Sequence, residues 1–204
     1  MALFRGMKFT NAGLNLLAKA LIGKELKFTC AWAGDGYLPE GREIAEMTEL
    51  ISPKRKMLIQ NMTIPPHIGI ANITVAMTNK DLTDGFFIRE IGLFAADPDT
   101  NNEVLYGYCN AGDTADFMPG SEGSSADLFH YICSLTAVVS QAKNVTAIFA
   151  DNPLHVTYIE MNDRIDTVLK YIKEHDDALQ EQINTLANTV IKNAIEDYEG
   201  VKKE

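Results

Sequence analysis

Residues 158–198 carry an apolar residue at nearly every third or fourth position, in a segment without proline or glycine. Such spacings are typical of a coiled coil, and the extra spacings of four in this segment locally unwind the supercoil. A single helix with so narrow an apolar stripe has no surface of its own to bury it. The segment therefore predicts a helix that associates with copies of itself in a parallel oligomer. The stripe consists of Tyr158, Met161, Ile165, Val168, Ile172, His175, Leu179, Ile183, Leu186, Val190 and Ala194.

An amphipathic helix that folds back on the preceding domain is the alternative for this segment. About forty residues at the helical rise give a rod of about 60 Å, which is longer than that domain would cover. The flanks, as at 173–174 and 176–177, are polar nearly all round, whereas a packed surface helix shows a wider apolar face. The copy number stays open, because the core residues over 165–172 suit three or four helices and those over 183–190 suit two. His175 is the weakest core position, since protonated rings on an axis would repel unless an anion or water lay between them.

The composition indicates a soluble, folded protein that binds neither membranes nor nucleic acid. Hydrophobic residues make up 46% of the chain, which excludes general disorder, and no run reaches the roughly eighteen apolar residues of a membrane span. Residues 1–13 lack the apolar core and the cleavage site of a secretory signal. The net charge of −10 argues against non-specific binding to nucleic acid. We read Cys30, Cys109 and Cys133 as small buried residues of a protein made in a reducing compartment.

Two domains are expected, a β-rich domain at 1–153 and an oligomerisation helix at 154–204, with Asp151-Asn152-Pro153 between them. Alternating apolar residues and turn signals in the first domain predict a series of strands. A brief helix or irregular linker is expected at 42–50. The predicted strands cover 25–33, 55–64, 68–77, 86–95, 103–109, 128–140 and 144–150.

A short helix opens the first domain. Thr10 or Asn11 can cap its start, and Gly23 is placed to end it in a left-handed conformation. Its leucines at 14, 17 and 21 share one face.

The clearest strand is 129–139. One face carries only apolar residues, and the other, which includes Ile132 and Val138, is itself half apolar. We therefore expect cover on both faces, as in a sandwich or in a sheet inside an assembly. The predicted fold class is mainly β, a sandwich-like domain with one or two short helices, followed by a long C-terminal α-helix that forms a parallel coiled coil.

Groupings typical of catalysis are not found in the sequence. Gly34-Asp35-Gly36 lacks the spacing of a phosphate loop and the alternating acids of a calcium loop, so a hairpin turn explains it better. Loop aspartates at 97, 99, 113 and 116 could gather round a cation, but their pairing with Pro and Gly is ordinary loop chemistry. No nucleophile elbow or zinc-protease helix motif occurs. We expect no enzymatic activity, no catalytic residue, no cofactor and no metal.

The stretch 86–95 differs from the other strands because it contains an arginine among apolar residues. Alternation places Phe87, Arg89, Ile91 and Leu93 on one side. A charge so placed usually has a partner. The alternative is an edge-strand arginine whose stem packs while its head reaches water.

Several short motifs occur in an order that resembles the tail-collar fibre proteins of bacteriophages. No single motif is specific, but the ordered set spans roughly residues 8–150. In that family a Thr-x-x-Gly helix and a Gly-Asp-Gly turn precede a block around the sequence Arg-Glu-Ile-Gly-Leu-Phe. Here the motif residues are Thr10-Asn11-Ala12-Gly13, Gly34, Asp35, Gly36, Arg89, Glu90, Ile91, Gly92, Leu93, Phe94, Ala95, Asp97-Pro98, Val104-Leu105-Tyr106 and Asn110-Ala111-Gly112-Asp113.

The resemblance implies the attachment domain of a tail fibre that joins a homotrimer to the baseplate of a contractile tail, in a phage or a phage-derived bacteriocin. Because the chain stops just after the predicted rod, we expect an adaptor that presents a separate fibre or receptor-binding protein; a truncated longer fibre would look the same. It would be made in the bacterial cytoplasm and assembled into the tail. The alternatives are a host-receptor-binding tip, with the loop at 119–127 as its contact surface, and a tail-associated hydrolase.

Overall fold

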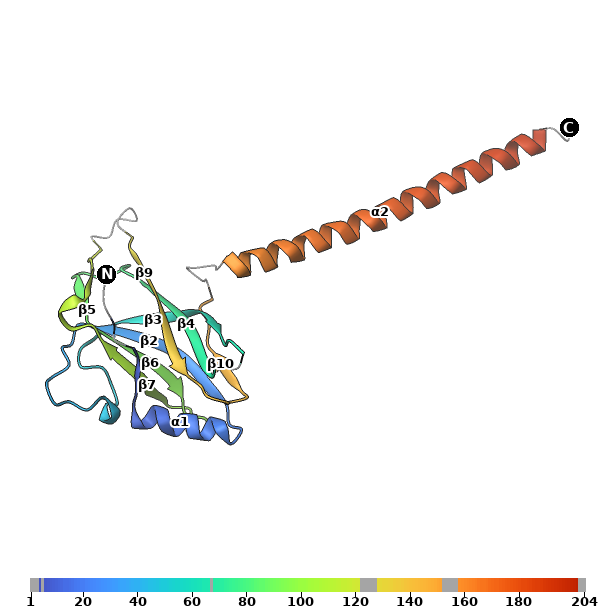
Figure 1. Cartoon of the computed structure of the whole chain (residues 1–204). Coiled ribbons are helices and arrows are strands. Elements are labelled where there is room, and N and C mark those ends of the chain that lie inside the picture. Colours follow the sequence, from blue (N-terminus) through green and yellow to red (C-terminus); the bar gives the residue numbers. More distant parts are fainter. Residues whose placement is uncertain (1–3, 5, 67, 122–127, 152–157, 202–204) are drawn as a thin grey trace. The chain divides into compact units, whose positions relative to one another are not determined.

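The computed structural model describes residues 4, 6–66, 68–121, 128–151 and 158–201, and within the last range the side chains of 169–177, 179–190 and 192. The chain divides into two compact units, Met1–His155 and Val156–Glu204. The described strands and α1 belong to the first unit, and α2 to the second (Figure 1). In chain order the elements are β1 Lys8–Phe9, α1 Asn11–Leu21, β2 Leu26–Gly34, the 3-10 turn η1 Ile44–Glu46, β3 Pro53–Thr63, β4 Ile70–Thr78, β5 Phe86–Ile88, β6 Glu90–Ala96, β7 Glu103–Asn110, the 3-10 turn η2 Gly112–Thr114, β8 Asp116–Met118, β9 His130–Val138, β10 Val145–Ala147 and α2 Tyr158–Val201.

Helix α1 is fixed at both ends by the residues that the sequence indicates. The Thr10 hydroxyl accepts a hydrogen bond from the backbone N–H of Gly13 at 2.9 Å and donates one to the carbonyl oxygen of Leu105 in β7. Gly23 follows the helix with φ +99°, a left-handed conformation that costs glycine little. The predicted cap and stop are therefore confirmed.

The face that α1 turns to the sheet is not the one that its leucines indicate. The buried residues are Gly13, Leu16 and Ala20. Leu14 and Leu21 are 47% and 52% exposed. Small residues on the buried face let the helix lie close to the backbone of β7.

Replacing Thr10 with alanine should lower the free energy of unfolding by about 1–2 kcal/mol, because the helix loses its N-cap. The carbonyl oxygen of Leu105 loses its hydroxyl donor in the same variant. Thermal unfolding followed by circular dichroism measures the change. The matched control is Thr10→Ser, which keeps the hydroxyl and should lose less than half as much. Equal losses in the two variants would show that the cap does not stabilise the domain.

Eight strands form one sheet with the order β1-β7-β6-β2-β3-β4-β9, to which β10 adds by pairing with β2. All the pairs are antiparallel except β10 with β2, which is parallel. The sheet curls into a half-barrel (Figure 1), and the curl brings β9, at one end of the order, near β7. The hydroxyl of Tyr106 in β7 donates to the carbonyl oxygen of Val138 in β9 at 2.6 Å. A separate two-stranded sheet pairs β5 with β8.

Two hydrophobic cores stabilise the first unit. The main core gathers buried side chains from α1 and from most of the sheet, among them Phe28, Ile59 and Leu93. A second, smaller core joins Leu105 and Tyr108 of β7 to the segment 38–50, with Trp32 of β2 packed against it. The segment after the Gly-Asp-Gly turn is thus held against β2, β6 and β7.

The predicted sandwich is wrong, because the long strands form one curled sheet. Strand β9 shows why the pattern of apolar residues gave a wrong prediction. Its inner residues Leu135 and Ala137 are buried, while Ile132 and Val138 on its other face are 38% and 42% exposed. Ile132 and Val138, whose apolar side chains predicted that both faces of the strand are buried, are therefore exposed to solvent on the outer face of the sheet.

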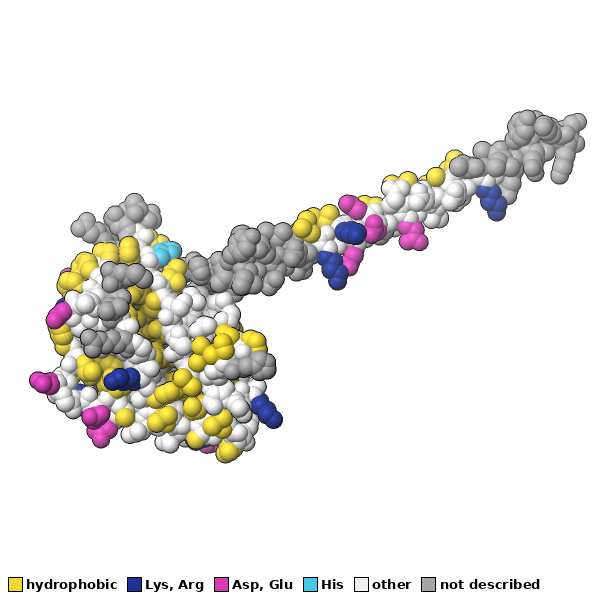
Figure 2. Space-filling view, in the orientation of Figure 1, with side chains coloured by type: hydrophobic (Ala, Val, Ile, Leu, Met, Phe, Trp, Pro, Cys, Tyr) yellow, Lys and Arg dark blue, Asp and Glu magenta, His cyan; other side chains and the backbone are white. Residues whose placement is uncertain are grey.

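The predicted coiled coil is also wrong as a description of the fold. Helix α2 is a solitary helix, and within the part whose side chains are described no second helix covers it. Its apolar stripe is exposed over that part, and Figure 2 shows hydrophobic side chains along one side of the helix. The exposed fractions are 48% for Ile172, 56% for Leu179, 59% for Ile183, 68% for Leu186 and 60% for Val190.

Candidate functional site

Three motifs that lie far apart in the sequence meet at one end of the sheet. The strand register places Gly34 of β2 opposite Glu90 of β6, and Glu90 opposite Asn110 of β7. Backbone hydrogen bonds join the same row, since Arg89 N–H donates to Gly34 O at 2.9 Å and Ala111 N–H donates to Arg89 O at 2.7 Å. The Gly-Asp-Gly turn, the Arg-Glu pair and the Asn-Ala-Gly-Asp turn therefore form one structural unit.

Glu90 is fully buried at the centre of this unit. Its Oε1 accepts hydrogen bonds from the backbone N–H groups of Ser52 at 2.6 Å and Gly36 at 3.3 Å. Its Oε2 accepts from Ile51 N–H at 3.0 Å and from the Tyr108 hydroxyl at 2.8 Å. All four partners are donors, which suits a carboxylate, because a carboxylate only accepts. We call Glu90 with these four partners the Glu90 frame.

Tyr108 connects the Glu90 frame to the turn that follows β7. Burial raises the pKa of Tyr108 well above its usual value; the hydrogen bond from Asn110 lowers it in part, and the charge of Glu90 adds to the rise. The hydroxyl therefore keeps its proton and donates a hydrogen bond to Oε2 of Glu90. The side-chain amide of Asn110 donates to the Tyr108 hydroxyl at 2.8 Å and to the carbonyl oxygen of Gly36 at 3.0 Å. Asn110 therefore connects Tyr108 to the Gly-Asp-Gly turn.

The glycines of the Gly-Asp-Gly turn are required by close approach to Glu90. A β-carbon on Gly34 would overlap the carbonyl oxygen of Ser52 and lie 2.5 Å from Glu90 Oε1. On Gly36 it would lie 2.6 Å from the β-carbon of Ile51 and 2.7 Å from Glu90 Oε1. Neither position has room for a side chain. The turn is therefore a packing element around a buried carboxylate, where the sequence indicated only a hairpin.

The remaining motif residues are structural. Asp35 forms an ion pair with Lys54 at 3.3 Å; burial would raise its pKa, but hydrogen bonds from Ser52 and Lys54 hold it below the usual value. Gly92 leaves room for Leu50, whose Cδ1 would lie 2.5 Å from an added β-carbon. Ile91 and Leu93 are buried in the main core, and the half-buried Phe94 packs against the smaller one.

Arg89 occupies a break that the alternating pattern does not show. The predicted single strand 86–95 is two strands in two different sheets, with Arg89 between β5 and β6. The prediction that Arg89 lies in one strand, on the same side as Ile91 and Leu93, is therefore wrong. The guanidinium carbon of Arg89 lies 4.3 Å from the centre of the Tyr37 ring and 4.8 Å from that of Phe87, distances typical of cation–π contacts.

Two exposed aromatic rings lie against Arg89, and a third lies against one of them. Tyr37 is 52% exposed, Phe87 44% and Phe117 53%. The rings of Phe87 and Phe117 lie 5.1 Å apart, as a cross-strand pair of β5 and β8. The Tyr37 hydroxyl donates to Asp113 at 3.1 Å, which orients its ring. We call Tyr37, Phe87, Arg89 and Phe117 the Arg89 patch.

Sequence reasoning identified the turn and the Arg-Glu pair but missed their partners. Tyr37 and Phe117 carry no signal of their own, because each lies in a segment that looks like an ordinary loop or a short strand. Tyr108 stands two residues before the Asn110 of a recognised motif, and this proximity is the one signal that pointed to it. The burial of Glu90, which alternation assigned to the face opposite Arg89, was not predicted.

Three of the four aspartates considered for a cation serve other roles. Asp97 and Asp99 bind Lys19 of α1 at 2.8 and 2.9 Å, and Asp113 accepts from Tyr37. Across the described residues no group of three or more His, Cys, Asp or Glu side chains could hold a metal ion. In that part of the chain, no helix is both long and apolar enough to cross a membrane.

Part of the predicted oligomer core and of the predicted contact loop lies outside the described residues. For Met161, Ile165 and Val168 the side chains are not described, and neither are residues 122–127 of the loop at 119–127. His175 is described and exposed, and the centre of its ring lies 4.0 Å from that of Tyr171, with the two rings tilted by 35°. The role of all these residues in an oligomer stays a prediction.

Comparison with known proteins found no matching family model, no matching curated protein and no matching solved structure. The resemblance to tail-collar fibre proteins therefore stays a prediction from the ordered motifs.

Proposed function

We propose that the chain is a non-catalytic structural subunit that associates with copies of itself, as a homotrimer, and serves as a fibre or fibre adaptor of a phage or bacteriocin tail. In this role the first unit docks on baseplate proteins, and α2 assembles the trimer that presents a separate fibre or receptor-binding protein. The exposed apolar stripe of α2 is the observation that carries the proposal. The ordered motifs support its placement in a tail.

Exposure of the stripe is costly for an isolated chain. Full burial of an aliphatic side chain is worth about 1.5–3 kcal/mol relative to leaving it in water. From Ile172 to Val190 five stripe residues are each about half exposed or more, on a helix whose other described side chains are mostly polar. Association with the same stripe of other copies buries all five at once. A structural subunit that works as an oligomer has this surface; a monomeric enzyme has no use for it.

Replacing Ile183 with aspartate should dissociate the oligomer, because each copy would place a charge in the buried contact, and an uncompensated buried ion costs several kcal/mol. Light scattering coupled to size exclusion measures the mass of the wild-type chain and of the variant. We expect three chains for the wild type and one for the variant. The control Gln182→Asp adds the same charge at the adjacent exposed position and should leave the trimer intact. A monomeric wild type, or an Ile183→Asp variant of unchanged mass, would contradict self-association through the stripe.

Placement in a tail needs a separate experiment. Antibodies against the chain, bound to particles from the bacterium that encodes it and viewed by electron microscopy, should label the baseplate end of a contractile tail. Label on capsids alone, or a chain recovered only outside particles, would contradict the proposed role and leave self-association untouched.

A further inference from the structure

The Arg89 patch combines a cation without an ion pair and three exposed aromatic rings. Within the described residues the guanidinium makes one hydrogen bond, from Nη1 to the carbonyl oxygen of Asp35 at 3.4 Å, and its Nε is buried without a partner. No carboxylate of that part of the chain forms an ion pair with it. Because acids outnumber bases in this chain, with a net charge of −10, an arginine left without an ion pair calls for an explanation.

We infer that the Arg89 patch is a docking surface for a protein segment that presents a carboxylate beside an apolar side chain. Charge complementarity selects the carboxylate, since the half-buried guanidinium beside Tyr37 and Phe87 forms no ion pair within the described residues. A charge-assisted hydrogen bond from a guanidinium N–H to a carboxylate is also stronger than one between neutral groups. The exposed rings of Phe87 and Phe117 select the apolar neighbour. Arginine and tyrosine are also the residue types that most often dominate the binding energy of protein interfaces.

The Glu90 frame holds this surface in place. Arg89 precedes the buried Glu90 directly, and its own N–H and C=O are bonded to Gly34 and Ala111. Tyr37 follows Gly36, which donates to the Glu90 carboxylate. Two of the four patch residues are thus attached directly to the Glu90 frame. The patch is therefore preorganised, which lowers the entropic cost of binding. Figure 2 shows hydrophobic side chains on the surface in the region of β5.

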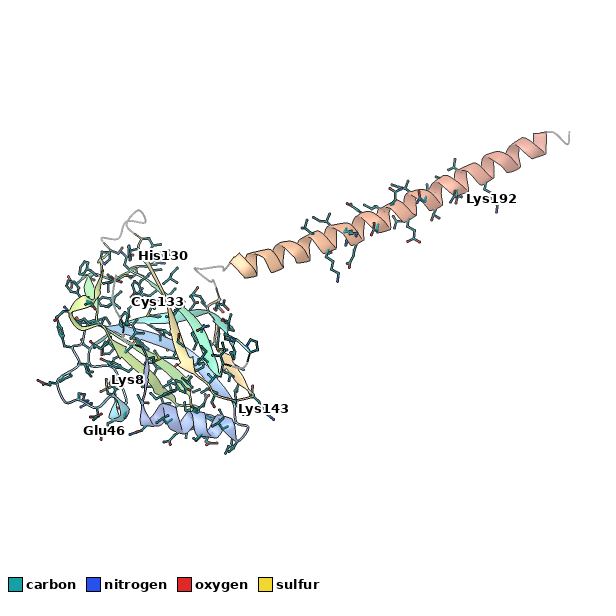
Figure 3. All side chains as sticks on the ribbon, viewed as in Figure 1. Lys8, Glu46, His130, Cys133, Lys143 and Lys192 are labelled. Atoms are coloured by element: carbon teal, nitrogen blue, oxygen red, sulfur yellow. The ribbon has the colours of Figure 1, made fainter. Side chains whose placement is uncertain are left out.

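The inference deepens the proposed function, and only the identity of the partner as a baseplate protein rests on that function. The chemistry of the site can be tested without it. The probe is a yeast-displayed library of random peptides, selected for binding to the full-length chain. The strongest peptide is then synthesised and titrated by calorimetry against the wild type, Arg89→Gln and the charge-matched control Lys143→Gln. Lys143 is exposed, and it lies on the side of the first unit away from β5, which carries Phe87 of the patch (Figures 1 and 3).

We expect the selected peptides to share an Asp or Glu next to an aromatic or aliphatic residue. Arg89→Gln should lower the affinity for the synthetic peptide about tenfold or more. Exchanging the acid of the peptide for its amide should lower the affinity for the wild type by a similar factor. The two changes together should lower the affinity little more than either change alone. Lys143→Gln should bind like the wild type. Selected peptides without a shared acid, or a peptide that binds Arg89→Gln as tightly as the wild type, would overturn the inference.

A second variant covers the case in which Arg89→Gln disturbs the fold. Phe117→Ser removes an exposed ring of β8 and leaves Arg89 and the Glu90 frame in place, and it should also weaken the peptide about tenfold. Unchanged affinity of Phe117→Ser for the peptide would overturn the aromatic part of the site. A negative peptide test would not contradict association through α2. An Ile183→Asp variant that stays trimeric would not contradict binding at the Arg89 patch. The two proposals can therefore fail independently.

Discussion

Replacement of Glu90 by glutamine should lower the free energy of unfolding of the first unit by about 3–5 kcal/mol. The carboxylate receives four donors on two oxygens, and glutamine would turn an NH₂ group toward at least one pair of them. Each buried donor left without an acceptor costs about 1–3 kcal/mol. Urea unfolding followed by the fluorescence of Trp32 measures the loss, because this single tryptophan lies in β2 and packs against the smaller core beside Tyr108.

The matched control for Glu90 is Glu46→Gln, which removes the same charge at an exposed position in η1 (Figure 3). We expect this variant to unfold within about 0.5 kcal/mol of the wild type, as is usual for surface substitutions. Similar stability of the two variants would show that the buried carboxylate does not hold the turn, the strands and the segment before β3 together.

Replacement of Gly13 by alanine should destabilise the first unit by about 3 kcal/mol, although the same change in an ordinary helix stabilises by about 1 kcal/mol. An added β-carbon would overlap the carbonyl oxygen of Tyr106 and lie 2.8 Å from its carbonyl carbon. Both atoms belong to the backbone of β7, so only a shift of the whole helix could relieve the clash. That shift would break the hydrogen bonds of Thr10 to β7.

Asn15→Ala provides the comparison in the same helix, since Asn15 is exposed. We expect this variant to match the wild type or to exceed its stability slightly. Denaturant unfolding of both variants gives the sign of each change. A Gly13→Ala variant that is as stable as Asn15→Ala would refute the close packing of α1 on β7.

Local patterns predicted much of the first unit but not its tertiary contacts. The cap at Thr10 and the stop at Gly23 were predictable because both act within a few residues of themselves. The buried face of α1 was not, since a glycine at position 13 gives no apolar signal and is buried only because a strand distant in sequence lies beside it. The curled sheet escaped prediction for a related reason: Ile132 and Val138 are apolar and exposed, and alternation counts them as evidence of a second covered face.

The candidate site shows the same limit of sequence reasoning. The glycines at 34 and 36 and the pair at 89–90 were recognised as motifs, yet nothing in their spacing shows that Glu90 accepts hydrogen bonds from the turn. Those contacts depend on the register between β2 and β6, which is set by the whole sheet. The break at Arg89 was hidden because Phe86 to Ala95 reads as one continuous apolar strand.

Strand β10 gives the first unit an order of folding. It pairs in parallel with the start of β2, and the residues after it bond to β3, where Ala150 N–H donates to Ile59 O at 2.8 Å. Its partners are made early in synthesis and β10 itself is made last in the unit, so this part of the central sheet stays unpaired until nearly the whole unit has left the ribosome. Pairing over so long a loop is slow and leaves strand edges open to wrong partners in the meantime. Because α2 is synthesised directly afterwards, the helix through which we propose that the chains associate is made only after all the described strands of the sheet.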